Sequence, residues 1–447
     1  MKKPQLTPYA LVAAIAVTVA LCPSEGLSQG FSPLAPEEEQ AVAIGLQAEA
    51  PREEVAALPF ESPGVVSAPP DGIGLDRLIS IALERSPRLA VQRAKVGESR
   101  AQALGAGLLP NPEFEGGAKK VSGDGTGPVI GVNQELPING VLGLQRRAAG
   151  FEYSAEQARL DREVQVVLAD VERAFVAVLA AGRKVDVDAR GLETASQSLQ
   201  LVSDTFQAGL VSSLPLGLAR SERANAKRTL ALSEKNLQLE RHGLALILGI
   251  EANDLPALSG DLNATLLDPA EVSAQANRPD LRAANLNLQA AQTNVQAAQR
   301  ARIPNPVLGY AREESDQETE DFFKIGLVIP ILNSGKAKVQ QGLAQRQTAS
   351  MEKSAVEKNV AIEIEQTSTR LEAARQAAQT YETEIRPANE ESLAAAQGAF
   401  TSGTTDLSLL LTTQSKLIDN ERGYVQALKE LREAEIGYRL ALGQVRY

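Results

Sequence analysis

A seven-residue apolar repeat constrains the fold of this chain more than any other feature of its sequence. Hydrophobic residues occupy every seventh position in one run: Val164, Val171, Val178, Val185, Leu192, Leu199 and Phe206. A second stripe lies three residues further on, at Val167, Ala174, Ala181, Ala195 and Val202, and it is interrupted at Asp188. Two such stripes form the seam of a coiled coil.

No proline interrupts residues 140–208, so the repeat predicts one helix about 100 Å long, at about 1.5 Å per residue. Gly209 follows, and glycine commonly ends helices because it adopts the left-handed conformation without strain. A second heptad, Leu230, Leu237 and Leu244, predicts a helix that returns alongside the first. The two helices would form an antiparallel helical hairpin.

The chain carries two copies of one large unit. Pro110-Asn111-Pro112 recurs as Pro304-Asn305-Pro306, and Phe206-x-x-Gly209 recurs as Phe400-x-x-Gly403, both at an offset of 194 residues. Leu136-Pro137-Ile138 recurs as Ile329-Pro330-Ile331 at an offset of 193. We expect repeats over residues 71–265 and 266–447, each with a helix, a β-hairpin, a long helix and a return helix. The predicted fold class is mainly α with a small β part.

Prolines set the helix boundaries that we expect, because proline lacks the amide hydrogen and clashes with the preceding turn. One helix should run from Asp76 to the residue before Pro110, and its counterpart from Glu271 to Ile303. Pro387 lies inside the second long helix and should kink it. The second return helix follows its own heptad: Leu410, Leu417, Tyr424, Leu431 and Tyr438.

Alternating residues predict strands between the first and the long helix of each repeat. Apolar residues share one face of the segment from Phe323 to Ile331, with Lys324 and Gly326 on the other face, and Val129–Leu136 alternates likewise. Weaker partner strands are expected near Glu113–Val121 and Pro306–Arg312. Strands of about 9–11 residues suit a tilted transmembrane β-strand. The alternative is a pair of surface hairpins on a soluble domain.

Four strands per chain are too few to close a barrel. An open sheet edge in lipid leaves backbone groups without hydrogen-bond partners. If the strands enter a membrane, several copies must therefore share one barrel. The long helices would then stand below it and form a duct across a compartment.

The N-terminus is predicted to be a targeting segment. Lys2 and Lys3 precede a short apolar run, Ala10–Leu21, which indicates a secretory signal over residues 1–28; a short membrane anchor is the alternative. Cys22 follows directly and is a candidate for lipidation, although Leu21 stands where lipoproteins usually have glycine or alanine. Residues 29–70 are rich in proline and glutamate, which predicts an unfolded linker.

Residues for catalysis or metal binding are sparse. The chain has one His and one Cys, which excludes multi-His metal centres, disulfide frameworks and Cys-based zinc sites. His242 has no nucleophile or paired acid beside it in the sequence, so we expect a structural residue, no enzyme activity and no cofactor. A net charge of −11 argues against a nucleic-acid partner.

As an ordered, duplicated set, the motifs resemble the TolC-type outer-membrane efflux family over nearly all of residues 74–447. They are Leu75-Asp76-x-x-Ile79-x-x-Ala82-Leu83-x-x-Ser86-Pro87, the two Pro-Asn-Pro strand starts, the Leu/Ile-Pro-Ile strand ends and the paired Phe-x-x-Gly turns. The residues around the Pro-Asn-Pro triplets are most similar to the metal-efflux (CzcC-like) branch. The resemblance implies a homotrimer with a twelve-stranded β-barrel in the outer-membrane lipid of a Gram-negative bacterium and a twelve-helix coiled-coil tunnel in the periplasm.

The resemblance also implies partners and a function. The expected partners are a periplasmic adaptor protein and an inner-membrane pump of the RND type. The protein would be the passive exit duct of a tripartite efflux system that serves a heavy-metal or multidrug pump. The alternatives are a periplasmic coiled-coil adaptor or structural protein, and the outer-membrane duct of type I protein secretion.

The hairpin turns are the sites that the resemblance assigns. The tip expected to dock the adaptor comprises Gly209, Ser212, Ser213, Gly403, Thr404 and Thr405. Asp406 is a candidate acid at the tunnel entrance, where three copies would approach one axis. In the alternative interpretation Asp406, Thr404 or Thr405 caps the second return helix, and Ser212 or Ser213 caps the first.

Overall fold

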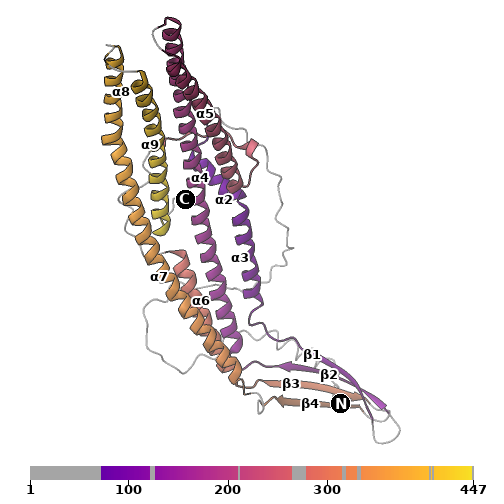
Figure 1. The fold of residues 1–447 in the computed structure, drawn as a ribbon. Coiled ribbons are helices and arrows are strands. Elements are labelled where there is room, and N and C mark those ends of the chain that lie inside the picture. Colours follow the sequence, from indigo (N-terminus) through magenta and orange to yellow (C-terminus); the bar gives the residue numbers. More distant parts are fainter. Residues whose placement is uncertain are drawn as a thin grey trace. The chain divides into compact units, whose positions relative to one another are not determined.

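The computed structural model describes residues 72–120, 126–209, 212–263, 278–314, 319–329, 334–401, 404 and 407–444. The chain divides into two units, residues 1–66 and 67–447, and every described residue belongs to the second. This unit is mainly helical, as predicted, and its described strands form one small sheet (Figure 1).

The first half of the unit contains two short helices, a β-hairpin and a helical hairpin. The elements are α2 Leu75–Arg85, α3 Pro87–Gly105, β1 Glu113–Lys120, β2 Thr126–Glu135, α4 Val141–Gln207, α5 Ser213–Leu248 and the 3-10 helix Ala252–Asp254. α4 has 67 residues and is about 100 Å long, at about 1.5 Å per residue. The long helix predicted from the heptads is therefore confirmed.

The second half repeats this order of elements. They are α6 Pro279–Arg300, β3 Pro306–Glu314, β4 Thr319–Leu327, α7 Lys336–Thr380, a π-helical segment Tyr381–Ile385, α8 Arg386–Thr401 and α9 Leu407–Ala441. α4, α5, α7 and α9 run side by side, and the sheet lies beyond the ends at which α4 and α7 begin (Figure 1).

The prediction of one unbroken first helix is wrong. The chain forms two helices, α2 and α3, separated at Ser86. The backbone of Ser86 is extended (φ −57°, ψ 121°) because the ring of Pro87 excludes the helical conformation from the residue before it. Proline is well suited to the first turn of a helix, so Pro87 both ends α2 and begins α3.

Pro387 is accommodated within the long helix of the second half, which continues past it. Directly before this proline the helix passes through the π-helical segment, where the Arg386 N–H donates to the carbonyl of Tyr381, five residues back. Such segments commonly mark the point at which a helix absorbs a disruption of its regular hydrogen bonds.

The four strands form an antiparallel sheet in the order β1-β2-β3-β4. The central β2–β3 pair joins the two halves of the unit, with Val132 opposite Tyr310. β4 begins earlier than expected, at Thr319, and ends at Leu327. Ile331, which we expected on the same strand, lies outside the described residues.

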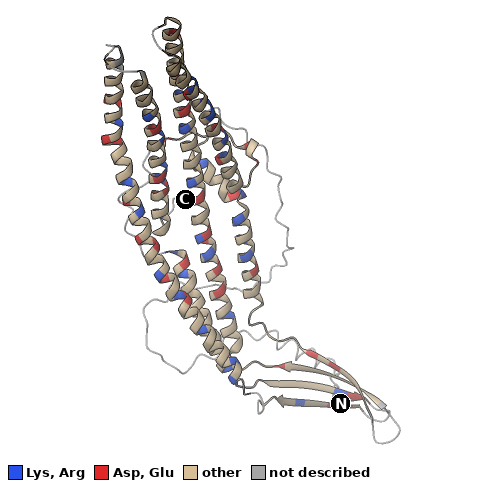
Figure 2. Cartoon of the chain, in the orientation of Figure 1, with Lys and Arg blue, Asp and Glu red and all other residues tan. Residues whose placement is uncertain are grey.

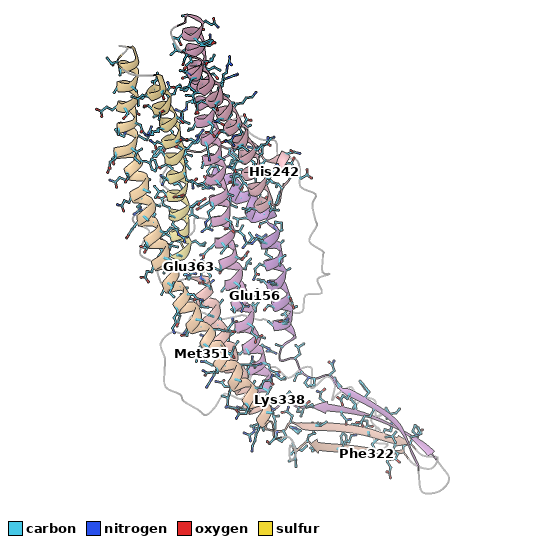
Figure 3. All side chains as sticks on the ribbon, viewed as in Figure 1. Glu156, His242, Phe322, Lys338, Met351 and Glu363 are labelled. Carbon is cyan, nitrogen blue, oxygen red and sulfur yellow. The ribbon has the colours of Figure 1, made fainter. Side chains whose placement is uncertain are left out.

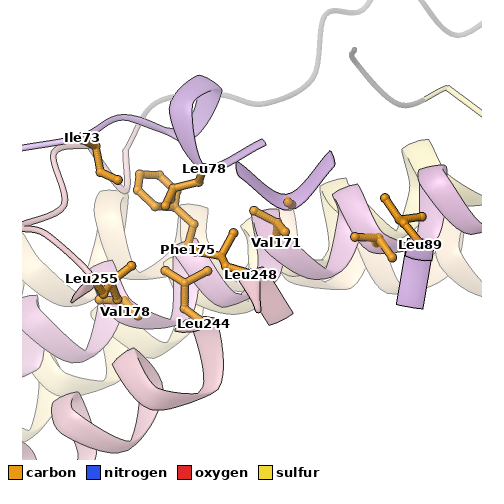
Figure 4. Close-up of a cluster of buried hydrophobic side chains, with 11 residues drawn as sticks. Ile73, Leu78, Leu89, Val171, Phe175, Val178, Leu244, Leu248 and Leu255 are labelled. Carbon is orange, nitrogen blue, oxygen red and sulfur yellow. The ribbon is translucent and has the colours of Figure 1, made fainter. Parts of the chain in front are cut away.

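Three apolar clusters hold the helices together. The first packs α2, α4 and α5 around fully buried Leu78, Val171, Leu244 and Leu248 (Figure 4). The second packs α4 against α9, and the third lies near the hairpin turns around Val202. Fully burying a side chain of this size contributes about 1.5–3 kcal/mol.

Candidate functional site

One face of the sheet is apolar and exposed. The register places Phe114, Ile130, Val132, Leu308, Tyr310, Phe323, Ile325 and Leu327 on this face. Gln134 and the Arg312–Asp321 ion pair, which lies nearer the hairpin loops, are polar residues on the same face. Phe323 and Ile325 are 64% and 79% exposed. Exposed apolar surfaces of this kind mark sites of contact with a membrane or with another protein. Alternation of outward apolar and inward polar residues is the pattern of transmembrane β-barrel strands.

The opposite face carries mostly charged, polar and small residues. Lys324 on β4 lies 2.8 Å from Glu115 on β1, with its side chain passing over Gly309. A β-carbon at Gly309 would come within 2.6 Å of the Lys324 chain, so glycine keeps this path open. Phe322, labelled in Figure 3, also lies on this face.

The Lys324–Glu115 contact shows which way the sheet curves. The two residues belong to the two edge strands. In a flat sheet these strands would lie about 14 Å apart, at about 4.8 Å per strand spacing. Side chains stand roughly perpendicular to a flat sheet, so the tips of these two would stay apart there. Their contact therefore indicates that the polar face is concave and the apolar face is convex.

Asparagine side chains connect the sheet to the helices. Asn139, just before α4, accepts a hydrogen bond from the Val141 N–H (3.1 Å) and donates to the Ile303 carbonyl (2.9 Å) at the end of α6. Asn305 of the second Pro-Asn-Pro triplet donates to Glu135 at the end of β2 (2.7 Å). These bonds join the two halves of the unit where strands and helices meet.

Asp188, which interrupts the apolar stripe of α4, is a buried charge with partners on two other helices. It is 1% exposed, accepts a hydrogen bond from Ser233 of α5, and lies 2.5 Å from the guanidinium of Arg422 on α9. Arg422 also contacts Asp419 at 2.6 Å. The interaction joins the first helical hairpin to the return helix of the second.

A second charged cluster joins α6, α7 and α9. Arg278 lies 2.6 Å from Asp280 and 2.8 Å from Glu363, and donates to the Ala441 carbonyl. Burial opposes the charged form of Asp280, but hydrogen bonds from Arg278 and its positive charge outweigh that effect and lower the pKa of Asp280. Elsewhere acidic and basic residues are interspersed along the helices (Figure 2).

The first hairpin turn has the geometry expected from its glycine. Gly209 has φ +74°, and its N–H donates to the Phe206 carbonyl at 2.9 Å. Ser212 occupies the N-cap position of α5 without a capping bond from its side chain, and Ser213 is the first residue of the helix. Leu214, on the first turn of α5, is 71% exposed.

The second hairpin turn is described only at Thr404. Its N–H and hydroxyl both donate to the Ala399 carbonyl, at 2.9 and 3.0 Å, and so close the end of α8. Gly403, Thr405 and Asp406 lie outside the described residues, as do Cys22, the expected signal segment and the expected linker.

His242 is exposed on α5 (Figure 3). Within the described residues, no group of three or more His, Cys, Asp and Glu side chains is arranged to hold a metal ion. None of the helices in the described part of the chain combines the length and hydropathy needed to cross a bilayer. Among these residues, the surfaces that stand out are therefore the two faces of the sheet and the exposed hairpin turn.

The fold and these surfaces define a class of protein: an outer-membrane channel whose β-barrel continues into a helical tunnel. The model of the family "Outer membrane efflux protein" matches residues 78–250 and 272–444. The chain belongs to this family. It is accordingly a protein of the outer membrane of a Gram-negative bacterium, with its helical tunnel in the periplasm.

Solved channels share this fold. A crystal structure of CusC superposes with a TM-score of 0.74 at 19% identity, covering 83% of this chain and 92% of that one. The open state of the Neisseria gonorrhoeae MtrE outer membrane channel superposes with a TM-score of 0.69 at 21% identity, covering 83% and 89%. The predicted fold class, which resembles trimeric barrel-and-tunnel channels, is confirmed.

Two curated relatives come from Pseudomonas putida. The pyoverdine export outer membrane protein OpmQ is 28% identical over 61% of this chain and 64% of its own length. The toluene efflux pump outer membrane protein TtgF is 28% identical over 57% and 54%. The chain thus spans less than two thirds of either relative. Both are outer-membrane export proteins rather than enzymes.

Sequence reasoning missed the buried ionic contacts between helices. Asp188 appeared only as a break in an apolar stripe, and that break was the available signal. Its partners Ser233 and Arg422 stand 45 and 234 residues away in sequence. The buried Glu172–Arg439 pair between α4 and α9 gave no comparable signal, because both residues occur among many other charged helical residues.

Proposed function

We propose that this protein is the outer-membrane exit duct of a tripartite efflux system, a passive channel across the periplasm and outer membrane. The observation that carries the proposal is the four-stranded sheet, with a convex apolar face and a concave polar face, attached to a helix of 67 residues. Such a sheet can face lipid on one side and an aqueous lumen on the other. Its helices have the length needed to extend the lumen into the periplasm.

The partners follow from membership in the family. We propose a periplasmic adaptor protein, docking at the hairpin turns, and an inner-membrane pump of the RND type. The first turn presents Gly209, Ser212 and Ser213 beside exposed Leu214. Thr404 belongs to the second turn, and Gly403 and Thr405 complete the proposed tip.

The cargo is proposed only by class. Sequence similarity around the Pro-Asn-Pro triplets favours a heavy-metal pump, whereas the names of OpmQ and TtgF refer to pyoverdine export and toluene efflux. With one His and one Cys in the chain, we propose that the pump selects the cargo. The second candidate function is that of the outer-membrane duct in type I protein secretion. The exposed apolar face of the sheet argues against the third alternative, a purely periplasmic structural protein.

Deletion of the gene tests this function. The deletion strain should become sensitive to a subset of a panel of metals, drugs and detergents, and the intact gene should restore growth. Sensitivity to metals alone would support the metal-efflux assignment. Unchanged growth on the whole panel, together with loss of a secreted protein, would contradict efflux and favour type I secretion.

Trimerisation is the expected oligomeric state, because four strands cannot close a barrel alone. Detergent-solubilised protein should have about three times the mass of one chain once the bound detergent is subtracted. Light scattering combined with size-exclusion chromatography measures this directly. A stable monomer with intact secondary structure would contradict the membrane-channel proposal.

Asp406 is proposed as an acid at the tunnel entrance. If three copies approach the axis, Asp406→Asn removes three negative charges from the constriction while keeping most of the capping ability of the side chain. We expect single-channel conductance or cation selectivity in planar bilayers to change. Unchanged conductance and selectivity, with folding intact, would leave Asp406 as a helix cap.

A further inference from the structure

The outer strands of the sheet each have a free edge. Among the described strands, β1 pairs with β2 alone and β4 pairs with β3 alone. Each free edge presents a row of backbone donors and acceptors, and in lipid these groups must find partners within protein. The proposed trimer supplies them if β4 of one copy pairs with β1 of the next.

The internal repeat supplies a register for that contact. The offset of 194 residues carries β3 onto β1, and the offset of 193 carries β2 onto β4. The central pair places Val132 of β2 opposite Tyr310 of β3. If the same contact is repeated between copies, Ile325 of β4 stands opposite Gly116 of the next copy.

The two faces of the sheet provide an independent check of this register. Ile325 lies on the convex apolar face, and Gly116 lies on the same face, between Phe114 and Ala118. A register shifted by one residue would put Lys324 opposite Gly116, and so a polar-face position opposite an apolar-face position. The difference of one residue between the offsets is odd, and an odd difference keeps both faces continuous.

The β1 edge has room for a neighbour in this register. A β-carbon at Gly116 or Gly117 would meet nothing within 4 Å. A β-carbon at Gly131 or Gly309, on the two central strands, would instead contact neighbouring strands at 3.3 and 2.5 Å. The side chains of Ile325 and Lys324 can therefore approach Gly116 and Gly117 of the next copy without a clash.

We propose that three copies of this chain close their barrel in this register, with Ile325 opposite Gly116 and Lys324 opposite Gly117 of the next copy. Gly326 then stands opposite Glu115, so Lys324 and that Glu115 are diagonal neighbours about 7–8 Å apart at their backbones. Lys324, which reaches its own Glu115 across the concave face in the single chain, bonds Glu115 of the next copy in the trimer. This proposal rests on the trimeric channel proposed above.

Disulfide cross-linking tests the register. Residues directly opposite each other have Cα atoms about 4.5–5.5 Å apart, within the range of about 4.4–6.8 Å that a disulfide spans. The double variant Gly116→Cys/Ile325→Cys, in intact outer membranes under mild oxidation, should give covalent dimers and trimers on a non-reducing gel. The matched control, Ala118→Cys/Ile325→Cys, is two positions out of register and should give none.

Each outcome has a distinct meaning. The wild type and the single-cysteine variants account for any linkage through Cys22, the one native cysteine. Cross-links from the shifted pair alone, or none from either pair in a protein of trimeric mass, would overturn the register and leave the proposed function intact. A monomeric mass would overturn the proposed function instead.

Charge reversal tests the exchanged ion pair. Glu115→Lys and Lys324→Glu should each lower the temperature at which the trimer dissociates in detergent. Co-expression of the two single variants places opposite charges together only across boundaries between copies. Mixed trimers should therefore be more heat-resistant than either homotrimer, and equal resistance would show that the pair does not form between copies.

Discussion

Replacing Arg422 with methionine should destabilise the protein by about 3 kcal/mol, at the lower end of the range of about 3–5 kcal/mol for breaking a buried pair. The substitution leaves the carboxylate of Asp188 buried without its positive partner, although the Ser233 hydroxyl still donates to it. The lower end applies because the Arg422 side chain is 26% exposed. Urea unfolding followed by helical circular dichroism measures the loss.

Two further variants show whether the buried charge is the cause. Adding Asp188→Asn to Arg422→Met removes the unpaired charge and should recover part of the lost stability. Arg282→Met breaks the Arg282–Asp161 pair, whose side chains are 44% and 50% exposed, and should cost at most about 1 kcal/mol. Equal losses for Arg282→Met and Arg422→Met would contradict a special role for Asp188.

Arginine at position 325 should strongly impair barrel assembly. Ile325 stands near the middle of the apolar positions on β4, which extend from Phe323 through Leu327 to the exposed Ile329 beyond the strand. An arginine on the lipid face costs about 2–4 kcal/mol at the bilayer midplane. The proposed barrel would carry three such arginines, so the amount of heat-resistant trimer in outer membranes should fall sharply for Ile325→Arg.

Lys324→Arg is the matched control, because it places the same side chain one residue away on the concave face. Its positive charge is retained next to Glu115, and we expect near-normal amounts of trimer. Leu327→Arg, nearer the end of the strand, should give an intermediate result. Equal assembly of Ile325→Arg and Lys324→Arg would contradict the assignment of the Ile325 face to lipid.

The sequence predicted well the features that depend only on residues close to one another in the chain. The heptad from Val164 to Phe206 specifies α4 because helical periodicity depends only on neighbouring residues. The alternation around Phe323 and Ile325 likewise predicted β4 and its apolar face. The class of the candidate site, a sheet with one exposed apolar face on long helices, was therefore accessible without a structure.

The features that the sequence did not predict depend on contacts between residues that are far apart in the chain. Ser86-Pro87 could end one helix or separate two, and Leu89 becomes part of the core only because α3 continues beyond the break. The contact between Lys324 and Glu115 depends on the curvature of the sheet, which no residue pattern encodes. The partners of Asp188 depend on which of many charged helical residues face α4.

The π-helical segment distinguishes the long helices of the two helical hairpins. α4 is an unbroken rod of 67 residues, and a regular helix of that kind bends only gradually. Before Pro387 the matching long helix changes to the π-helical segment. There Tyr381 packs against Gly423, and the Arg386 guanidinium lies 4.8 Å from the centre of the Tyr424 ring. In the proposed trimer, regular and π-interrupted long helices would alternate around the tunnel, and we expect any bending of the tunnel to occur at the π-helical segments.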